Sequence, residues 1–102
     1  MPKNQQPTST VAGDVFVWDS PDPDVGQVNV PLKFKSKILR AAKKMQDDQL
    51  GFMFYVLDSI GVPAAQVDEM DVGELKAMFT AWQVAWAEQA GADFPEASRS
   101  SI

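Results

Sequence analysis

The chain of 102 residues is long enough for one domain, and 45% hydrophobic with 23% charged residues is an ordinary globular composition. It contains neither cysteine nor histidine, which excludes disulfides, thiolate metal sites and the commonest general base at neutral pH. The net charge is −5, yet six of the nine basic residues fall between positions 33 and 44. No apolar run is long enough to cross a bilayer and no secretory signal is recognisable, so we expect a soluble intracellular protein.

The first residues of the chain divide into a tail and two short apolar runs. Residues 1–13 are polar and cannot bury apolar area, so we expect a flexible N-terminal tail. Residues 14–91 are expected to form a single domain, and residues 92–102 a second flexible tail. Within the domain, residues 15–18 and 28–32 are β-branched or alternating apolar runs separated by turn formers, which predicts a β-hairpin.

Two helices are predicted after the hairpin. Ser36 is a candidate N-cap for a helix over residues 37–45, whose basic side chains lie opposite its apolar side. Asp47 or Asp48 caps a second helix, which runs to about Ile60 and is apolar over most of its circumference. Its predicted core face comprises Leu50, Met53, Phe54, Leu57 and Ile60. Three apolar residues fall off this face and are available for a partner: Phe52, Tyr55 and Val56.

The last predicted helix carries the main wall of the core. Pro63 begins a short helical turn over residues 64–69, and Asp71 then caps a helix that ends before Gly91. Glu74 is placed to bond back to the Asp71 amide, as in a capping box. Apolar residues recur on one stripe of this helix: Leu75, Met78, Phe79, Trp82 and Trp86. We therefore predict a mainly α-helical domain of three to four helices with a short N-terminal β-hairpin.

Few residues could carry chemistry. The clustered carboxylates have simpler interpretations as turn formers and helix caps, and the sequence has neither a glycine-rich phosphate loop nor a nucleophile paired with a base. We expect no enzymatic activity, no cofactor and no metal site.

A basic block lies in the first predicted helix and the segment before it: Lys33, Lys35, Lys37, Arg40, Lys43 and Lys44. The favoured interpretation is a solvated helix face, with the last lysines complementing the helix dipole. Nucleic-acid binding is a weaker alternative, because the domain is acidic overall and offers no interleaved aromatic residues for base stacking. Docking of an acidic partner segment is a third.

The side of the last helix that lies opposite its aromatic stripe carries alanine and valine with few charges. High helix propensity explains alanine there, but a smooth surface for a partner helix is the alternative. The resulting hypothesis for partner binding comprises Phe52, Tyr55, Val56, Ala77, Ala81 and Val84.

Two stretches of the sequence bear a family resemblance, namely Leu-x-x-x-Phe-x-x-Trp-Gln over residues 75–83 and Glu-Ala-Ser over residues 96–98. Together with the strand–turn–strand and the lysine-rich helix before them, they give a chain that resembles the short form of the tail assembly chaperones of long-tailed bacteriophages. The similarity covers roughly residues 14–102.

This resemblance implies a non-enzymatic protein of the infected bacterial cytoplasm that is absent from the mature virion. Such chaperones are thought to bind the helical tape-measure protein and keep it soluble until tail-tube subunits polymerise around it. Further implied partners are the tail-tube protein and a longer form of the chain made by ribosomal frameshifting; a homo-oligomer is also compatible. Two alternatives stay open: a small helical nucleic-acid-binding regulator that uses the 33–44 block, and a structural head–tail connector or minor tail protein.

Overall fold

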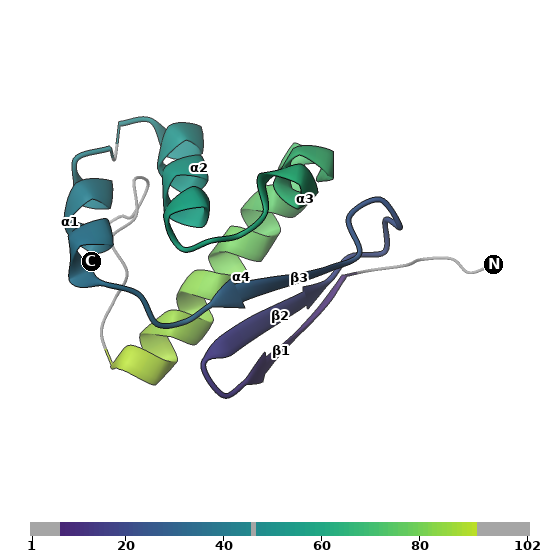
Figure 1. Ribbon diagram of the computed structural model, residues 1–102, viewed down its shortest axis with the longest axis horizontal. Coiled ribbons are helices and arrows are strands. Elements are labelled where there is room, and N and C mark those ends of the chain that lie inside the picture. The colour runs from purple at the N-terminus through teal and green to yellow at the C-terminus, as the bar shows by residue number, and fades with distance from the viewer. Residues whose placement is uncertain (1–6, 46, 92–102) are drawn as a thin grey trace.

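A three-stranded sheet and four helices make up the part of the chain that the computed structural model describes, residues 7–45 and 47–91 (Figure 1). The elements in chain order are β1 (Thr8–Ala12), β2 (Val15–Asp19), β3 (Gln27–Pro31), α1 (Ser36–Lys43), α2 (Gln49–Ser59), α3 (Ala64–Glu69) and α4 (Val72–Ala90). The strands pair antiparallel in the order β1-β2-β3. The domain is therefore mixed α and β, and the prediction of a mainly α-helical domain with only a hairpin is wrong.

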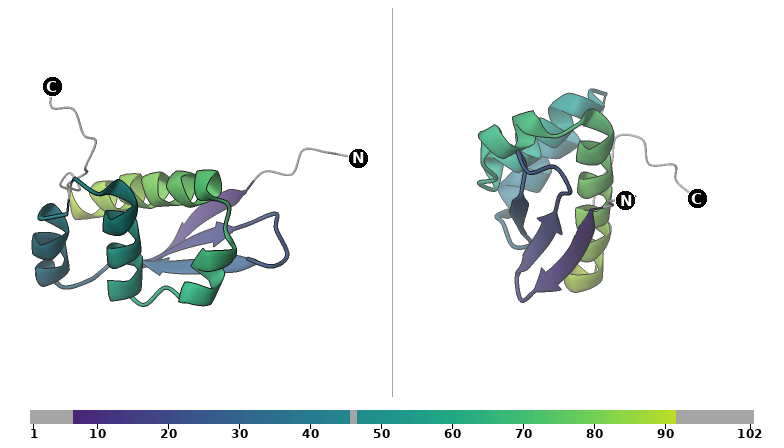
Figure 2. Two further views of the ribbon diagram at one scale, coloured as in Figure 1. Left: turned by 90° about the horizontal axis from the view of Figure 1, so that it is seen from above. Right: turned by 90° about the vertical axis from the view of Figure 1, so that its right-hand side faces the viewer.

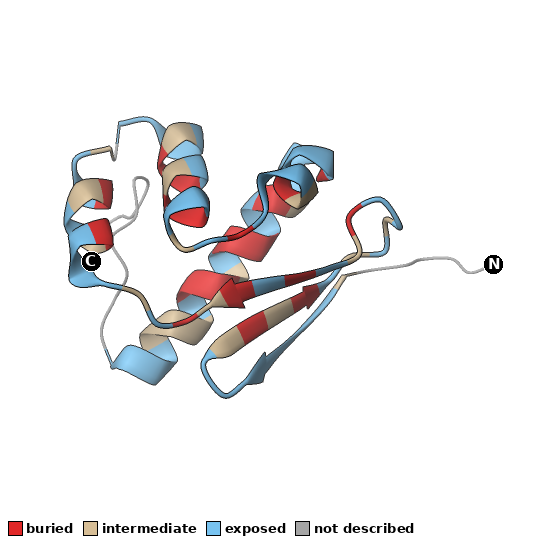
Figure 3. Ribbon diagram, in the orientation of Figure 1, coloured by how far each residue is buried: buried red, intermediate tan, exposed pale blue. Residues whose placement is uncertain are grey.

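The additional strand, β1, lies in the segment that was expected to be a flexible tail. Ala12 pairs with Val15 across the two-residue turn Gly13-Asp14, and Gly13 has a φ of 64°. A glycine with positive φ at the first turn position is the pattern of type II′ turns, whose twist suits an antiparallel hairpin. All five residues of β1 are exposed, so this edge strand forms without contributing to the core (Figure 3). Residues 1–6 of that expected tail, and the expected tail over residues 92–102, lie outside the described residues.

One face of the sheet carries the apolar residues of β2 and β3. Phe16 pairs with Val30 and Trp18 with Val28, and all four side chains are buried. Val11 of β1 lies opposite Phe16 on the same face, yet it is 52% exposed. The core therefore lies beneath β2 and β3 and does not extend beneath β1.

Three helix ends lie at the positions predicted from local sequence signals. Asp48 caps α2 and Asp71 caps α4, each accepting a hydrogen bond from a first-turn backbone N–H, and Gly91 closes α4 with a φ of 73°. The predicted cap of α1 is wrong. Ser36 is the first helical residue, and the N-cap is Lys35, which makes no side-chain capping bond.

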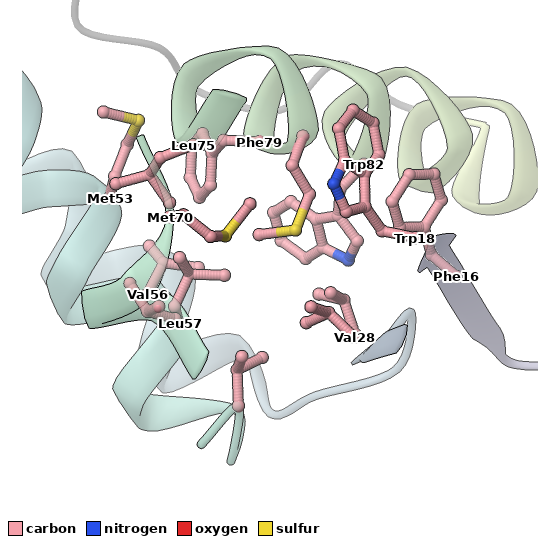
Figure 4. Packing of buried hydrophobic residues seen from close by; sticks show 14 of the residues in the cluster. Phe16, Trp18, Val28, Met53, Val56, Leu57, Met70, Leu75, Phe79 and Trp82 are labelled. Carbon is pink, nitrogen blue, oxygen red and sulfur yellow. The ribbon is translucent and has the colours of Figure 1, made fainter. Parts of the chain in front are cut away.

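Helix α4 lies across the buried face of the sheet, α2 packs beside α4, and α1 lies beside α2, away from the sheet (Figure 1 and Figure 2). Aromatic rings fill the space between these elements. The rings of Phe52 and Phe79 meet edge to face at 5.7 Å, and those of Phe79 and Trp82 lie 5.4 Å apart. Figure 4 shows this cluster, to which the sheet contributes Phe16, Trp18 and Val28 and α4 contributes Leu75, Phe79 and Trp82. One continuous core thus joins the sheet to the helices.

Gln66 of α3 is a polar anchor to the β2–β3 connection, because its Nε2 donates to the carbonyls of Val25 and Gln27, both at 2.8 Å. Gln66→Ala should lower the free energy of unfolding by about 1–2 kcal/mol, since two backbone carbonyls lose a donor. Chemical denaturation measures this. Gln89→Ala, which removes one exposed bond to the Gly13 carbonyl, is the control and should cost less than about 0.5 kcal/mol. Equal losses for both variants would contradict the anchoring role.

Candidate partner-binding surfaces

The residues that carry the family resemblance in α4 build the core. Leu75, Phe79 and Trp82 are buried, and Gln83 is buried beside them. These side chains form the inner side of α4 and are not available to a partner. The motif therefore fixes how α4 packs, and any binding surface must lie elsewhere on the molecule.

Polar side chains also attach the inner side of α4 to the sheet. Trp82 Nε1 donates to the carbonyl oxygen of Pro31 at 2.9 Å. Trp18 Nε1 donates to Glu74 Oε2 at 2.8 Å, so the Glu74 carboxylate bonds the sheet instead of serving the predicted capping box. Gln89 Nε2 donates to the Gly13 carbonyl at 2.9 Å. These hydrogen bonds are spread along α4 from Glu74 to Gln89. They therefore attach α4 to the strands and to the β1–β2 turn along most of its length.

The outward side of α4 carries three of the six residues predicted to bind a partner. Ala77 is exposed, Ala81 is half-buried and Val84 is 54% exposed. No charged residue occurs between Lys76 and Glu88. The result is a strip of three helical turns with small side chains and no charge.

The predicted faces of α2 are wrong in part, because Met53 and Leu57 are buried as predicted but four other residues are misplaced. Phe52 and Val56, assigned to the partner surface, are buried, whereas Phe54 and Leu50, assigned to the core, are 41% and 40% exposed. Tyr55 is half-buried. The cause is that α2 is apolar nearly all round, so its periodicity does not select a face and the contact with α4 decides it. Phe52 and Val56 are therefore excluded from the partner-binding set.

A surface pocket of about 260 Å³ lies between α2 and α3. Phe54, Ala64 and Val67 supply its apolar lining, and the carboxylates of Asp58 and Asp68 lie at the same site. None of these was predicted as a site residue. Asp58 follows Phe54 by four residues, which places both on one side of α2 and was a usable signal in the sequence.

A second, larger pocket of about 520 Å³ lies at the C-terminal end of α4. Its polar groups are already engaged with one another: Lys33 Nζ lies 3.7 Å from Asp14 Oδ2, and Gln89 bonds the Gly13 carbonyl. Its aromatic wall, Phe34 and Trp86, stacks at 6.0 Å. The residues that line this pocket therefore contact one another and pack the sheet against α4.

The basic block is entirely exposed. Lys33 and Lys35 lie in the segment before α1, and the other four residues lie on or just after α1: Lys37, Arg40, Lys43 and Lys44. Ile38 and Ala42 form the buried side of that helix. The sequence-based interpretation of an apolar side opposite a basic side is confirmed for α1.

Within residues 7–45 and 47–91, no three carboxylates come together as a set of metal ligands. No helix in this part of the chain is long and apolar enough to span a membrane. Comparison with known protein families, with curated proteins and with solved structures finds no match to this chain.

Proposed function

We propose that this chain is a non-enzymatic tail assembly chaperone that binds the tape-measure protein in the host bacterial cytoplasm and keeps it soluble. The resemblance over residues 14–102 supports the family, and the outward strip of α4 supports the mode of binding. Val84, exposed at the middle of an uncharged helical surface, is the observation that carries the proposal.

The outward strip of α4 suits a helical partner for a steric reason. Alanine side chains at positions 77 and 81 let a second helix approach closely, and Val84 supplies an apolar contact one turn further on. A helix that faces only water usually alternates charges along its surface. The inner side of α4 is buried in the core, so a second helix can contact α4 only on its outward strip.

Val84→Asp should reduce the amount of tape-measure protein that co-purifies with the chain by about tenfold or more, because an unpaired carboxylate would be buried against the partner helix. The measurement is co-expression with a tape-measure protein from the same genome, followed by affinity purification at moderate salt. Val72→Asp is the matched control, since Val72 is a 53% exposed valine in the first turn of the same helix. This control should co-purify the partner as the wild type does.

Circular dichroism and thermal melting establish that both variants are folded. Equal partner recovery with wild type, Val84→Asp and Val72→Asp would contradict the placement on α4. A tape-measure protein that stays insoluble beside the folded wild-type chain would contradict the chaperone function itself.

Nucleic-acid binding is the second candidate, favoured by the exposure of all six residues of the basic block. Phosphate binding by these residues would fall steeply with rising salt, because bound counterions are released from the nucleic acid. Absorbance at 260 nm in the purified sample, lost on a high-salt wash, would support this second function in place of the first.

A further inference from the structure

The pocket between α2 and α3 combines an apolar lining with an acidic rim. Phe54 is 41% exposed although it lies in a helix whose other large residues are mostly buried. Together with Ala64 and Val67 it offers an apolar wall to any side chain that enters the space of about 260 Å³. Such an exposed ring is available for contact from outside the domain.

The rim of the pocket is negative for two independent reasons. Asp58 lies in the last turn of α2 and Asp68 in the last turn of α3, and neither last turn contains a basic residue. Helix C-termini carry partial negative charge, so these carboxylates add to the helix dipoles instead of offsetting them. Among the described residues, Lys33 and Asp14 form an ion pair, but neither Asp58 nor Asp68 does. The rim therefore presents uncompensated negative charge.

We propose that this pocket binds a lysine or arginine side chain from an amphipathic helix of the partner. The aliphatic stem would lie on Phe54 and Val67, and the cationic head would reach the carboxylates of Asp58 and Asp68. Lysine and arginine combine an apolar stem with a cationic head, which matches both parts of the site. The inference rests on the proposed function for the helical nature of the partner, and it adds the chemistry of the contact.

A purely apolar side chain fits the site less well. An apolar side chain would cover the lining. It would also desolvate the two carboxylates without donating a hydrogen bond to them, and this desolvation costs free energy. An acidic partner helix would meet like charge at both carboxylates. The structure thus favours a partner helix in which basic residues are interspersed with aliphatic ones.

Two fluorescent amphipathic peptides of about 18 residues, long enough to form a helix, test this directly against the full-length protein. They carry leucine at the same positions, with lysine at all polar positions in one peptide and glutamate in the other. Fluorescence anisotropy should show the lysine peptide binding at least about tenfold more tightly than the glutamate peptide. Asp58→Asn combined with Asp68→Asn should weaken the lysine peptide by about tenfold, because the two charge contacts are lost while side-chain size is kept.

The matched control is Asp47→Asn combined with Glu88→Gln, which removes the same net charge from two other exposed positions, one before α2 and one near the C-terminal end of α4. It should bind the lysine peptide within about twofold of the wild type, since distant surface charges contribute little. Phe54→Ala should weaken binding as well, because the stem loses its aromatic contact. Equal weakening by both double variants would overturn the proposal, since net charge alone would then explain the binding.

The peptide assay tests the pocket and the co-purification tests the chaperone function, so one proposal can fail while the other stands. Recovery of tape-measure protein together with equal affinity for the two peptides would overturn the pocket and leave the chaperone function intact. Selective binding of the lysine peptide that is lost in Asp58→Asn with Asp68→Asn, without recovery of tape-measure protein, would support the pocket and overturn the function. If Asp58→Asn with Asp68→Asn instead reduced the sedimentation mass of the protein alone, the occupant would be the basic block of a second copy, and the proposal would be overturned.

Discussion

Replacing Trp82 by alanine is expected to lower the free energy of unfolding by about 3–5 kcal/mol, a large share of what a domain of this size possesses. The side chain is fully buried, and its ring lies 5.4 Å from that of Phe79 and 5.8 Å from that of Phe34. Its Nε1 donates to the Pro31 carbonyl at 2.9 Å. The substitution thus opens a cavity at the contact of α4 with the sheet and leaves the end of β3 without a donor.

Urea denaturation followed by far-UV circular dichroism measures the loss. Val84→Ala, two residues further along the same helix, is the control, because its side chain is 54% exposed and should cost less than about 0.5 kcal/mol. Trp82→Phe should fall between them, since it keeps a ring and loses the hydrogen bond. A loss of less than about 1 kcal/mol for Trp82→Ala would contradict the docking of α4 on β3.

Three of the helix ends were the most predictable part of this fold, because at these ends the capping contacts are made by neighbouring residues alone. Asp48 and Asp71 cap their helices by bonding a first-turn N–H, and Gly91 adopts the left-handed conformation that ends α4. The aromatic stripe of α4 was predictable for a similar reason, since a period of 3.6 residues places it on one side. Leu75, Met78, Phe79 and Trp82 are buried, and Trp86, the last residue of the predicted stripe, is half-buried.

Strand β1 was missed because the prediction gave weight to apolar content. Thr8–Ala12 buries none of its residues, so composition alone did not separate it from a tail. The turn carried the usable signal: Gly13-Asp14 connects a threonine-rich run to the apolar run at Val15, and a two-residue glycine turn between such runs indicates a hairpin. An edge strand needs only this turn and the hydrogen bonds of its neighbour.

The exposure of the residues proposed to bind a partner was predictable in part, because α4 has one clearly apolar side and α2 does not. Ala77 and Val84 are exposed because the aromatic stripe of α4 fixes its inward side, whereas Ala81 is half-buried and packs against the edge of the core. No such contrast exists in α2, where tertiary contacts decide. The acidic pocket depends on how α2 and α3 lie together, and residues on separate helices cannot be brought together by periodicity.

The second large effect on stability is expected at Phe52 of α2, and Phe54, two residues further on, is its comparison. Phe52→Ala should lower the free energy of unfolding by about 3–5 kcal/mol, while Phe54→Ala should cost less than about 1 kcal/mol. Phe52 is 2% exposed and meets Phe79 edge to face at 5.7 Å, whereas Phe54 is 41% exposed at the α2–α3 pocket. The two substitutions remove the same atoms from the same helix, so each is the control for the other.

Equilibrium denaturation of both variants, followed by tryptophan fluorescence, separates the two possible rotations of α2. The faces predicted from sequence would make Phe54→Ala the costly substitution and Phe52→Ala the mild one, so the order of the two losses is decisive. The order expected from the structure would also leave Phe54→Ala folded and usable in the peptide assay. Phe54 would then be a residue whose removal weakens binding while the fold persists, which is what separates a docking side chain from a core one.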